Sequence, residues 1–409
     1  MRIGTRFYRL FTTLCISITF SLAASYAAAS AESELIEALQ AQINTLTSRL
    51  DALENAQPAG PTSAGTLSPG PARPQTKPAP SWADTITLKG DFRYRHEAFD
   101  IEDTTDRHRQ RLRARTELSA QINDTTRVGF GLASGNSDPI STNQTIGNAA
   151  SSKGVVLDLA YVDWATPVDG MSVLAGKFKN PLHRAGGNGL IWDSDLRPEG
   201  VALRYRNGHI FANAMGLYID EDSSGEDALM LGGQFGINTN LGAGKLRAGA
   251  GYYHFTDAKD REVFFVGIPL GNRVNPDGTY VSDFEIVEGF AEYSFGLNQG
   301  TMTLFADYAN NLGADDFETG YAFGVRLEQE KWNFSWAYQD LEADAVLGLF
   351  TDSDFIGGGT DGKGHILQTG YALTKRVGLR GTLFLNDRNI AFGPEEEFKR
   401  LMLDISFKY

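Results

Sequence analysis

The chain has 409 residues with 51 acidic and 37 Lys or Arg side chains, which gives a formal net charge of −14 at pH 7. An acidic protein repels phosphates, so this balance argues against a nucleic-acid partner. The only cysteine, Cys15, lies near the N-terminus, so we expect no disulfide to hold the fold together.

The first 31 residues have the three parts of a secretory signal peptide. Arg2, Arg6 and Arg9 supply positive charge, an apolar run rich in small residues follows, and "AAASAES" offers cleavage sites near residues 29–31. A membrane anchor is the alternative, because the apolar run is almost long enough to span a bilayer. The small residues and the polar continuation favour cleavage. Removing three arginines and no acid would change the net charge from −14 to −17.

Residues 32–56 carry three heptads, with isoleucine prominent at the a positions and leucine at the d positions. This spacing predicts a short coiled coil built on Ile36, Leu39, Ile43, Leu46, Leu50 and Leu53. The alternative is a single amphipathic helix that packs on a domain. A segment of this length is barely enough for an isolated helix, so we expect the coil to form when another part of the protein oligomerises. Ile at a with Leu at d favours dimers.

Residues 57–83 form a proline-rich linker. Seven of the chain's 14 prolines lie between residues 57 and 80, and such a segment is extended and builds no core.

From residue 84 to residue 409 the sequence alternates between apolar and polar side chains. In "KWNFSWAYQD", Trp332, Phe334 and Trp336 share one face while Asn333 and Ser335 occupy the other. Period-two patterning predicts strands with one apolar face. We count sixteen, near 85–98, 106–122, 126–135, 153–165, 171–179, 199–206, 210–220, 227–238, 244–256, 284–296, 301–311, 318–328, 331–342, 363–373, 376–387 and 399–409.

Short and long connectors alternate between these strands, which is typical of a transmembrane β-barrel with periplasmic turns and longer external loops. A soluble β-sandwich is the alternative, but the polar faces carry too many charges for its core. We therefore predict an all-β, 16-stranded antiparallel barrel preceded by a coiled-coil helix. In lipid, a closed barrel satisfies every backbone polar group. An even strand number places both ends of the barrel in the periplasm.

The chain resembles the Gram-negative outer-membrane porins over the signal peptide and residues 84–409. The terminal Phe407 and Tyr409 look like the aromatic ending that the barrel assembly machinery recognises in that family, and "AGKFKNPLHRAGG" looks like the putative-porin branch of the phosphate-porin type. The coiled coil is similar to the periplasmic extension of sugar-specific porins. The resemblance implies a homotrimer in the outer membrane, in contact with lipid and lipopolysaccharide.

The phase of the alternation assigns the inward face of each strand. On the strand near residues 106–122, Leu112, Leu118 and Ile122 point outward, so the arginine ladder points inward: Arg107, Arg109, Arg111, Arg113 and Arg115. An arginine that faced lipid near the midplane would cost roughly 2–4 kcal/mol, so the ladder must line water. Four further basic residues complete the predicted pore lining, namely Arg93, Arg95, Lys177 and Lys179.

The third long connector follows Lys179 and contains further charged residues, namely His183, Arg184, Asp193, Asp195 and Arg197. In sixteen-stranded porins this loop folds inward, so the resemblance implies that Asp193 and Asp195 oppose the arginines across a constriction. The alternative leaves the loop at the surface and its aspartates solvated. Charged rows of this kind select among ions and polar solutes.

Other motifs carry no chemistry of their own. "GGGTDGKG" satisfies a glycine-rich nucleotide pattern, but a strand follows it where a helix would be needed, so we interpret it as a loop. The histidines have no metal spacing, and we expect no cofactor and no catalytic site.

The sequence predicts a passive porin for small hydrophilic solutes and ions. A substrate-selective channel for anions or sugars is the close alternative. A structural tether that contacts peptidoglycan and a hydrolase embedded in the barrel are more distant ones.

Overall fold

The computed structural model of the chain describes residue 48 and residues 85–223, 225–265 and 267–409. The expected signal peptide, the six coiled-coil positions and the proline-rich linker lie outside the described residues, so those interpretations stay predictions. Within the described ranges, the protein has no helix with the length and apolarity that crossing a membrane requires.

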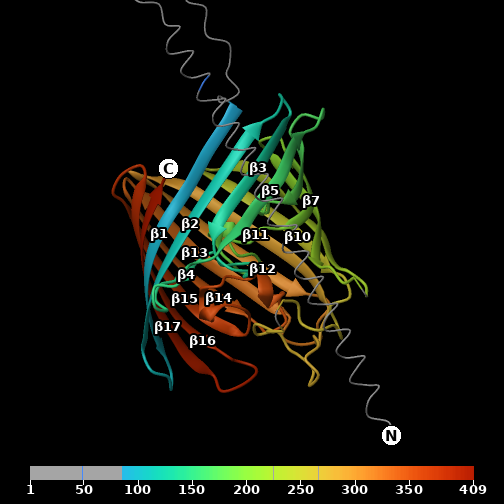
Figure 1. The fold of residues 1–409 in the computed structure, drawn as a ribbon, viewed down its shortest axis with the longest axis vertical. Helices are drawn as coiled ribbons and strands as arrows, with labels where there is room; N and C mark the ends of the chain where they lie inside the picture. Colours follow the sequence, from blue (N-terminus) through green and yellow to red (C-terminus); the bar gives the residue numbers. More distant parts are fainter. Residues whose placement is uncertain (1–47, 49–84, 224, 266) are drawn as a thin grey trace, which may run out of the picture. The chain divides into compact units, whose positions relative to one another are not determined.

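The described strands form one antiparallel sheet that closes on itself, because β17 pairs back to β1 (Figure 1). Sixteen of them build the barrel, as the sequence predicts. The additional strand β4, Gln144–Thr145, pairs with β2 from within a loop. The barrel strands are β1 Ile86–Ile101, β2 Arg107–Gln121, β3 Thr126–Ser134, β5 Val155–Ala165, β6 Met171–Lys177, β7 Glu199–Arg206, β8 Ile210–Asp220, β9 Ala228–Leu241, β10 Gly244–Phe255, β11 Phe284–Leu297, β12 Gly300–Asn311, β13 Thr319–Gln329, β14 Trp332–Leu341, β15 Gly362–Ala372, β16 Val377–Arg388 and β17 Glu396–Lys408.

The outer face of the barrel is apolar. Leu88, Phe92, Phe130, Phe334 and Leu403 are exposed, and each alternates along its strand with residues of the inner face. In a soluble protein such a belt of apolar side chains would be a liability, but lipid contact satisfies it. The apolar phase read from the sequence therefore identifies the outer surface.

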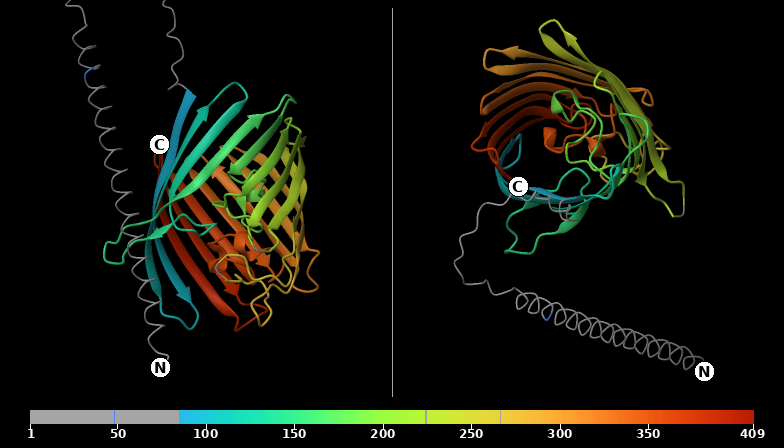
Figure 2. Two further views of the ribbon diagram at one scale, coloured as in Figure 1. Left: turned by 45° about the vertical axis from the view of Figure 1, so that its right-hand side comes forward. Right: turned by 90° about the horizontal axis from the view of Figure 1, so that it is seen from above.

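Connectors at the two ends of the barrel differ in length. The end that holds the C-terminus has short turns, and the opposite end has the long loops (Figure 1). Four long loops matter below, and we call them L2 (residues 135–154), L3 (178–198), L5 (256–283) and L7 (342–361). The right panel of Figure 2, which looks down on the barrel from above, shows segments of L3 in green and of L7 in orange inside the ring of strands.

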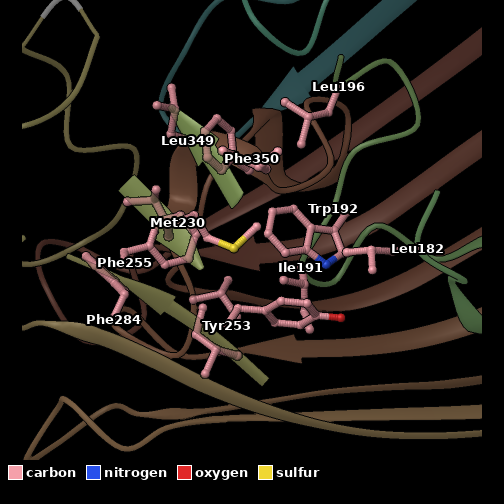
Figure 3. Close-up of a cluster of buried hydrophobic side chains, with 14 of the residues drawn as sticks. Leu182, Ile191, Trp192, Leu196, Met230, Tyr253, Phe255, Phe284, Leu349 and Phe350 are labelled. Carbon is pink, nitrogen blue, oxygen red and sulfur yellow. The ribbon is translucent and has the colours of Figure 1, made fainter. Parts of the chain in front are cut away.

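A large cluster of buried apolar side chains joins these loops to the barrel wall (Figure 3). Trp192 of L3 is 2% exposed, and its ring centroid lies 5.0 Å from that of Tyr253 on β10 and 6.2 Å from that of Phe350 on L7. Phe264 and Tyr280 of L5 belong to the same cluster. The inward faces of β8 to β12 are thus more apolar than a water-filled barrel requires, because they pack against loops.

Backbone hydrogen bonds hold L3, L5 and L7 together. The amide of Asp193 donates to the carbonyl of Phe350 at 2.7 Å, and the amide of Asp352 donates to the carbonyl of Gly189 at 3.0 Å. On the other side of L7, Thr360 donates its amide to Leu270 of L5 at 2.9 Å. The glycine-rich segment interpreted as a loop is one up to Asp361, where it is packed in this assembly, and its last three residues begin β15.

The tip of L3 rests against the wall opposite β2. The amide of Gly186 donates to Glu292 on β11 at 2.5 Å, and Asn188 donates to Asp307 on β12 at 2.8 Å. Gly186 has φ +61°, and a Cβ there would lie 2.4 Å from the ring of Phe305. Only glycine combines this left-handed backbone with so close an approach.

Candidate functional site

Charged side chains on the inner face of β1, β2 and β17 lie next to one another across the sheet. In the sheet register Arg93 lies opposite Arg113, and Arg95 lies between Arg111 on one side and Asp404 on the other. Directly opposite residues in a sheet have side chains that touch, and like charges so placed repel each other. The arginine ladder therefore needs carboxylates to balance it.

Some of these carboxylates come from the wall itself. Asp404 accepts two hydrogen bonds from Arg95, at 2.7 and 3.0 Å, in the bidentate arrangement that arginine and carboxylate favour. Glu97 is fully buried and accepts from Arg109 at 2.5 Å and from Arg400 at 2.6 Å. These pairs fix the guanidinium groups in place.

L3 supplies a further carboxylate, Asp195. Its oxygens lie 3.1 Å from Arg113 and 2.7 Å from Arg115, and both arginines also bind Asp91 at 2.9 Å. Asp193, which the sequence pairs with it, points elsewhere. Its carboxylate accepts from the amide of Asp195 at 2.5 Å and from the amide of Ser353 at 2.9 Å.

L7 supplies a carboxylate that sequence reasoning missed. Asp354 lies 3.0 Å from Arg95 and 2.9 Å from Arg400. The sequence holds one signal for it, because "DSD" occurs at residues 193–195 of L3 and again at residues 352–354 of L7. In both turns the first aspartate accepts the amide of the second, at 2.8 Å in L7, and the second reaches the arginines.

Burial and charge separate the four aspartates of these turns. Burial and the neighbouring Asp352 raise the pKa of Asp193 to about 8, and burial and Asp354 raise the pKa of Asp352 to about 6. Burial acts in the same direction on Asp195, but Arg113 and Arg115 outweigh it and hold its pKa below the usual value. Arg400 and Arg95 likewise lower the pKa of Asp354 against burial.

The other predicted residues near L3 do not bind Asp195, although Lys179 and Arg197 line the same cavity as Arg113 and Arg115. Lys177 binds Glu199 at 2.6 Å and Lys179 binds Glu117, while Arg197 lies 3.3 Å from Asp158. His183 and Arg184 belong to the part of L3 that faces the opposite wall. There, His183 lies 3.1 Å from Glu292, and Arg184 donates to the carbonyls of Asn188 and Trp192.

L2 contacts the remaining arginines of the ladder and of β1. Arg93 donates to the side chain of Asn143 at 2.6 Å, and Arg111 donates to the carbonyl of Asn143 at 3.3 Å. Arg107 lies at the long-loop end with its guanidinium 6.0 Å from the ring centre of Phe99.

The arginine ladder runs between two cavities. One, of about 650 Å³, lies at the short-turn end, and Arg113 and Arg115 line it together with Lys89, Lys375 and Lys408. The other, of about 630 Å³, lies at the long-loop end and is lined by Arg107, Arg109 and Arg111. Within the described ranges, no group of three or more His, Cys, Asp or Glu side chains is arranged to hold a metal ion.

A family model described as "Putative porin" matches residues 100–266 and 310–409, which is more than half of the chain. The chain belongs to the putative-porin family. Like the porins, it is an outer-membrane channel protein for the diffusion of solutes, and its closed 16-stranded barrel agrees with that membership. No curated protein sequence matches the chain.

A solved structure shows the same fold. The high-pH structure of OprB from Pseudomonas putida covers 80% of this chain and 94% of its own, with a TM-score of 0.56 and 11% identity. OmpF of Salmonella typhi in complex with daunomycin covers 79% of this chain and 97% of its own, with a TM-score of 0.49 and 11% identity. At 11% identity, the likeness to OprB supports only the fold of this porin and not its function.

Proposed function

We propose that this porin is a passive channel for small hydrophilic solutes and ions that prefers anions. The observation that carries the proposal is the arginine ladder, which joins a cavity at one end of the barrel to a cavity at the other. A solute that moves between the two passes the guanidinium groups of Arg111 and Arg113.

The balance of charge along this wall supports anion preference. We call the charged, inward-phase residues of β1, β2, β16 and β17 the basic wall. It comprises twelve basic residues and five acids: Lys89, Arg93, Arg95, Arg107, Arg109, Arg111, Arg113, Arg115, Arg380, Arg388, Arg400 and Lys408, with Asp91, Glu97, Glu117, Glu396 and Asp404. Asp195 and Asp354 raise the number of acids to seven, so an excess of five positive charges remains.

The two loop carboxylates bind the basic wall directly and narrow the space beside it. Asp195 lies 2.7 Å from Arg115 and Asp354 lies 3.0 Å from Arg95, so a solute passes beside these ion pairs and meets the excess positive charge of the wall. Arginine stays protonated at every physiological pH, so this excess persists between pH 5 and pH 9. The packed apolar cluster of L3, L5 and L7 holds these loops inside the barrel.

The surroundings of the channel follow from the sequence. We propose that the barrel is a homotrimer in contact with lipid and lipopolysaccharide, that residues 32–56 form a coiled coil in the periplasm, and that Phe407 and Tyr409 are read by the barrel assembly machinery. The heptads and the aromatic ending support these proposals. Loss of co-sedimentation with peptidoglycan after deletion of residues 32–56 would favour the tether as an added role.

Planar-bilayer recording tests the proposal directly. Purified protein should give ion-conducting steps. In a KCl gradient, the reversal potential should lie nearer to the equilibrium potential of chloride than to that of potassium. Arg111→Ala and Arg113→Ala should each move the reversal potential towards potassium. A protein without conducting steps would overturn the channel, and an unchanged reversal potential in both variants would overturn the role of the ladder.

A substrate-selective channel is the second candidate. The cavity at the long-loop end favours it, because apolar side chains line it beside the arginines. A solute that blocks the chloride current at low concentration would distinguish this function from unselective diffusion.

A further inference from the structure

The cavity at the long-loop end has two chemically different sides. It lies between β1, β2 and β17 and the loops L2, L5 and L7, and its volume of about 630 Å³ is that of a small-molecule site. Its basic side is formed by Arg107, Arg109, Arg111, Arg388 and Arg400, and one acid, Asp138 of L2, lines the cavity beside them. Its apolar side is formed by Phe99, Phe265, Ile268, Leu270, Leu349 and Phe398.

Aromatic rings hold several of these arginines. The guanidinium carbons of Arg109 and Arg400 lie 5.1 and 5.0 Å from the ring centre of Phe99, and that of Arg388 lies 5.3 Å from the ring centre of Phe398. Stacking on a ring occupies the face of a guanidinium and leaves the N–H groups at its edge to bind acceptors. These three arginines already bind Glu97 and Glu396 through their edges. The rings therefore hold the basic side rigid, and Arg107 and Arg111 supply the remaining donors.

Two arginines of the cavity have donors to spare. Arg107 is exposed and forms no ion pair with any residue that the structure describes. The nearest carboxylate to Arg111 is Glu97 at 3.8 Å, and the Nε of Arg111 is buried without a hydrogen-bond partner. Arg109 stands between them and already binds Glu97. An incoming carboxylate would find the exposed N–H groups of Arg107 on one side of the Arg109–Glu97 pair and the partly satisfied guanidinium of Arg111 on the other.

The apolar side is open to solvent as well. Ile268 of L5 is 54% exposed and Phe265 is 37% exposed. An inorganic anion would bind the arginines and leave these side chains wet, and a neutral sugar would satisfy neither side. A solute with a carboxylate at one end and an apolar body at the other would cover both.

We propose that this cavity binds small monocarboxylates with an apolar, preferably aromatic, body before they enter the channel. The carboxylate binds Arg107, Arg109 and Arg111, and the body packs against Phe99 and Ile268. The inference rests on the proposed anion channel for its biological use, but the binding itself can be measured without conductance.

Benzoate, acetate and benzamide are the probes. In detergent solution, saturation-transfer NMR and titration calorimetry on the full protein should show benzoate binding at least about tenfold tighter than acetate, because burial of the ring adds to the ion pair. Benzamide, which has the ring without the charge, should bind more weakly than benzoate. In bilayers, external benzoate should block the chloride current at a correspondingly lower concentration than acetate.

Two variants separate the two sides of the cavity. Ile268→Ser should weaken benzoate several-fold and acetate little, and Arg107→Gln should weaken both. Val274→Ser is the matched control, because Val274 is an exposed residue of the same loop that does not line the cavity.

Equal affinity for benzoate and acetate, or for benzoate and benzamide, would overturn the inference while leaving a conducting channel intact. Tight benzoate binding to a protein without chloride conductance would instead support the site and overturn the proposed channel.

Discussion

Replacing Asp195 by asparagine is expected to make the channel more selective for anions. The side chain keeps its size but loses one negative charge beside Arg113 and Arg115, which lie 3.1 and 2.7 Å from its oxygens. An anion about 4 Å from that carboxylate is repelled by about 1 kcal/mol in a water-like dielectric. Removing this repulsion should raise the permeability of the anion about fivefold, because about 1.4 kcal/mol corresponds to a factor of ten.

A cation loses the same amount of attraction, so the unscreened permeability ratio of anion to cation would rise about 25-fold. At 0.15 M salt, charges are screened over about 8 Å, and we expect a rise of about tenfold. The measurement is the reversal potential across a tenfold KCl gradient. Arg113→Gln should shift it in the opposite direction.

Asp277→Asn is the control for charge alone. Asp277 is exposed on L5 and accepts hydrogen bonds from Thr279, so its loss should change the permeability ratio less than twofold. If Asp195→Asn conducts normally and its reversal potential equals that of the unsubstituted protein, permeating ions do not pass this carboxylate.

Three further predictions concern the loops and the end of the chain. Because the pKa of Asp193 is raised to about 8, packing of L3 on L7 is most stable below the ordinary carboxyl pKa and weakens as pH rises towards 8. Open-channel noise should therefore increase between pH 5 and pH 9, and Asp193→Asn should remove the part of the increase above pH 6, because Asp352, with a pKa of about 6, titrates below it. Gly186→Ala should displace L3 and raise conductance, since its Cβ would meet Phe305, whereas Gly208→Ala, with φ +88° and open space, should not. Tyr409→Ala should reduce the fraction of the protein in outer membranes that is folded, measured by its change of gel mobility on heating. An undiminished folded fraction would argue that Tyr409 is not part of an assembly signal.

The barrel could be predicted because its pattern is local. Period two along each strand identifies the apolar phase, and the inward phase of the arginine ladder follows at once. The position of L3 in the chain and the resemblance to porins predict Asp193 and Asp195 across a constriction from the arginines, whereas the structure has Asp195 alone in direct contact with Arg113. Each of these inferences needs only neighbouring residues or a known loop.

Where L7 goes could not be predicted, because its path depends on contacts between distant segments. Asp354 reaches Arg95 only after L3 and L7 have packed together, and nothing near residue 354 specifies that partner. Asp193 and Asp195 also looked equivalent in the sequence. They differ because a tight turn uses the first carboxylate to accept a backbone amide, which leaves the second free to bind arginine.

The seam between β1 and β17 has a consequence for how the protein is built. Arg95 pairs with Asp404 and Glu97 pairs with Arg400 across this seam, so the first and last strands complete each other's charges. Before closure the partners across the seam are missing, and only Arg109 for Glu97 and Asp354 for Arg95 and Arg400 are left to balance these charges. A partly assembled sheet is therefore penalised until its final strand docks. The basic wall and the closed barrel are then completed in the same step.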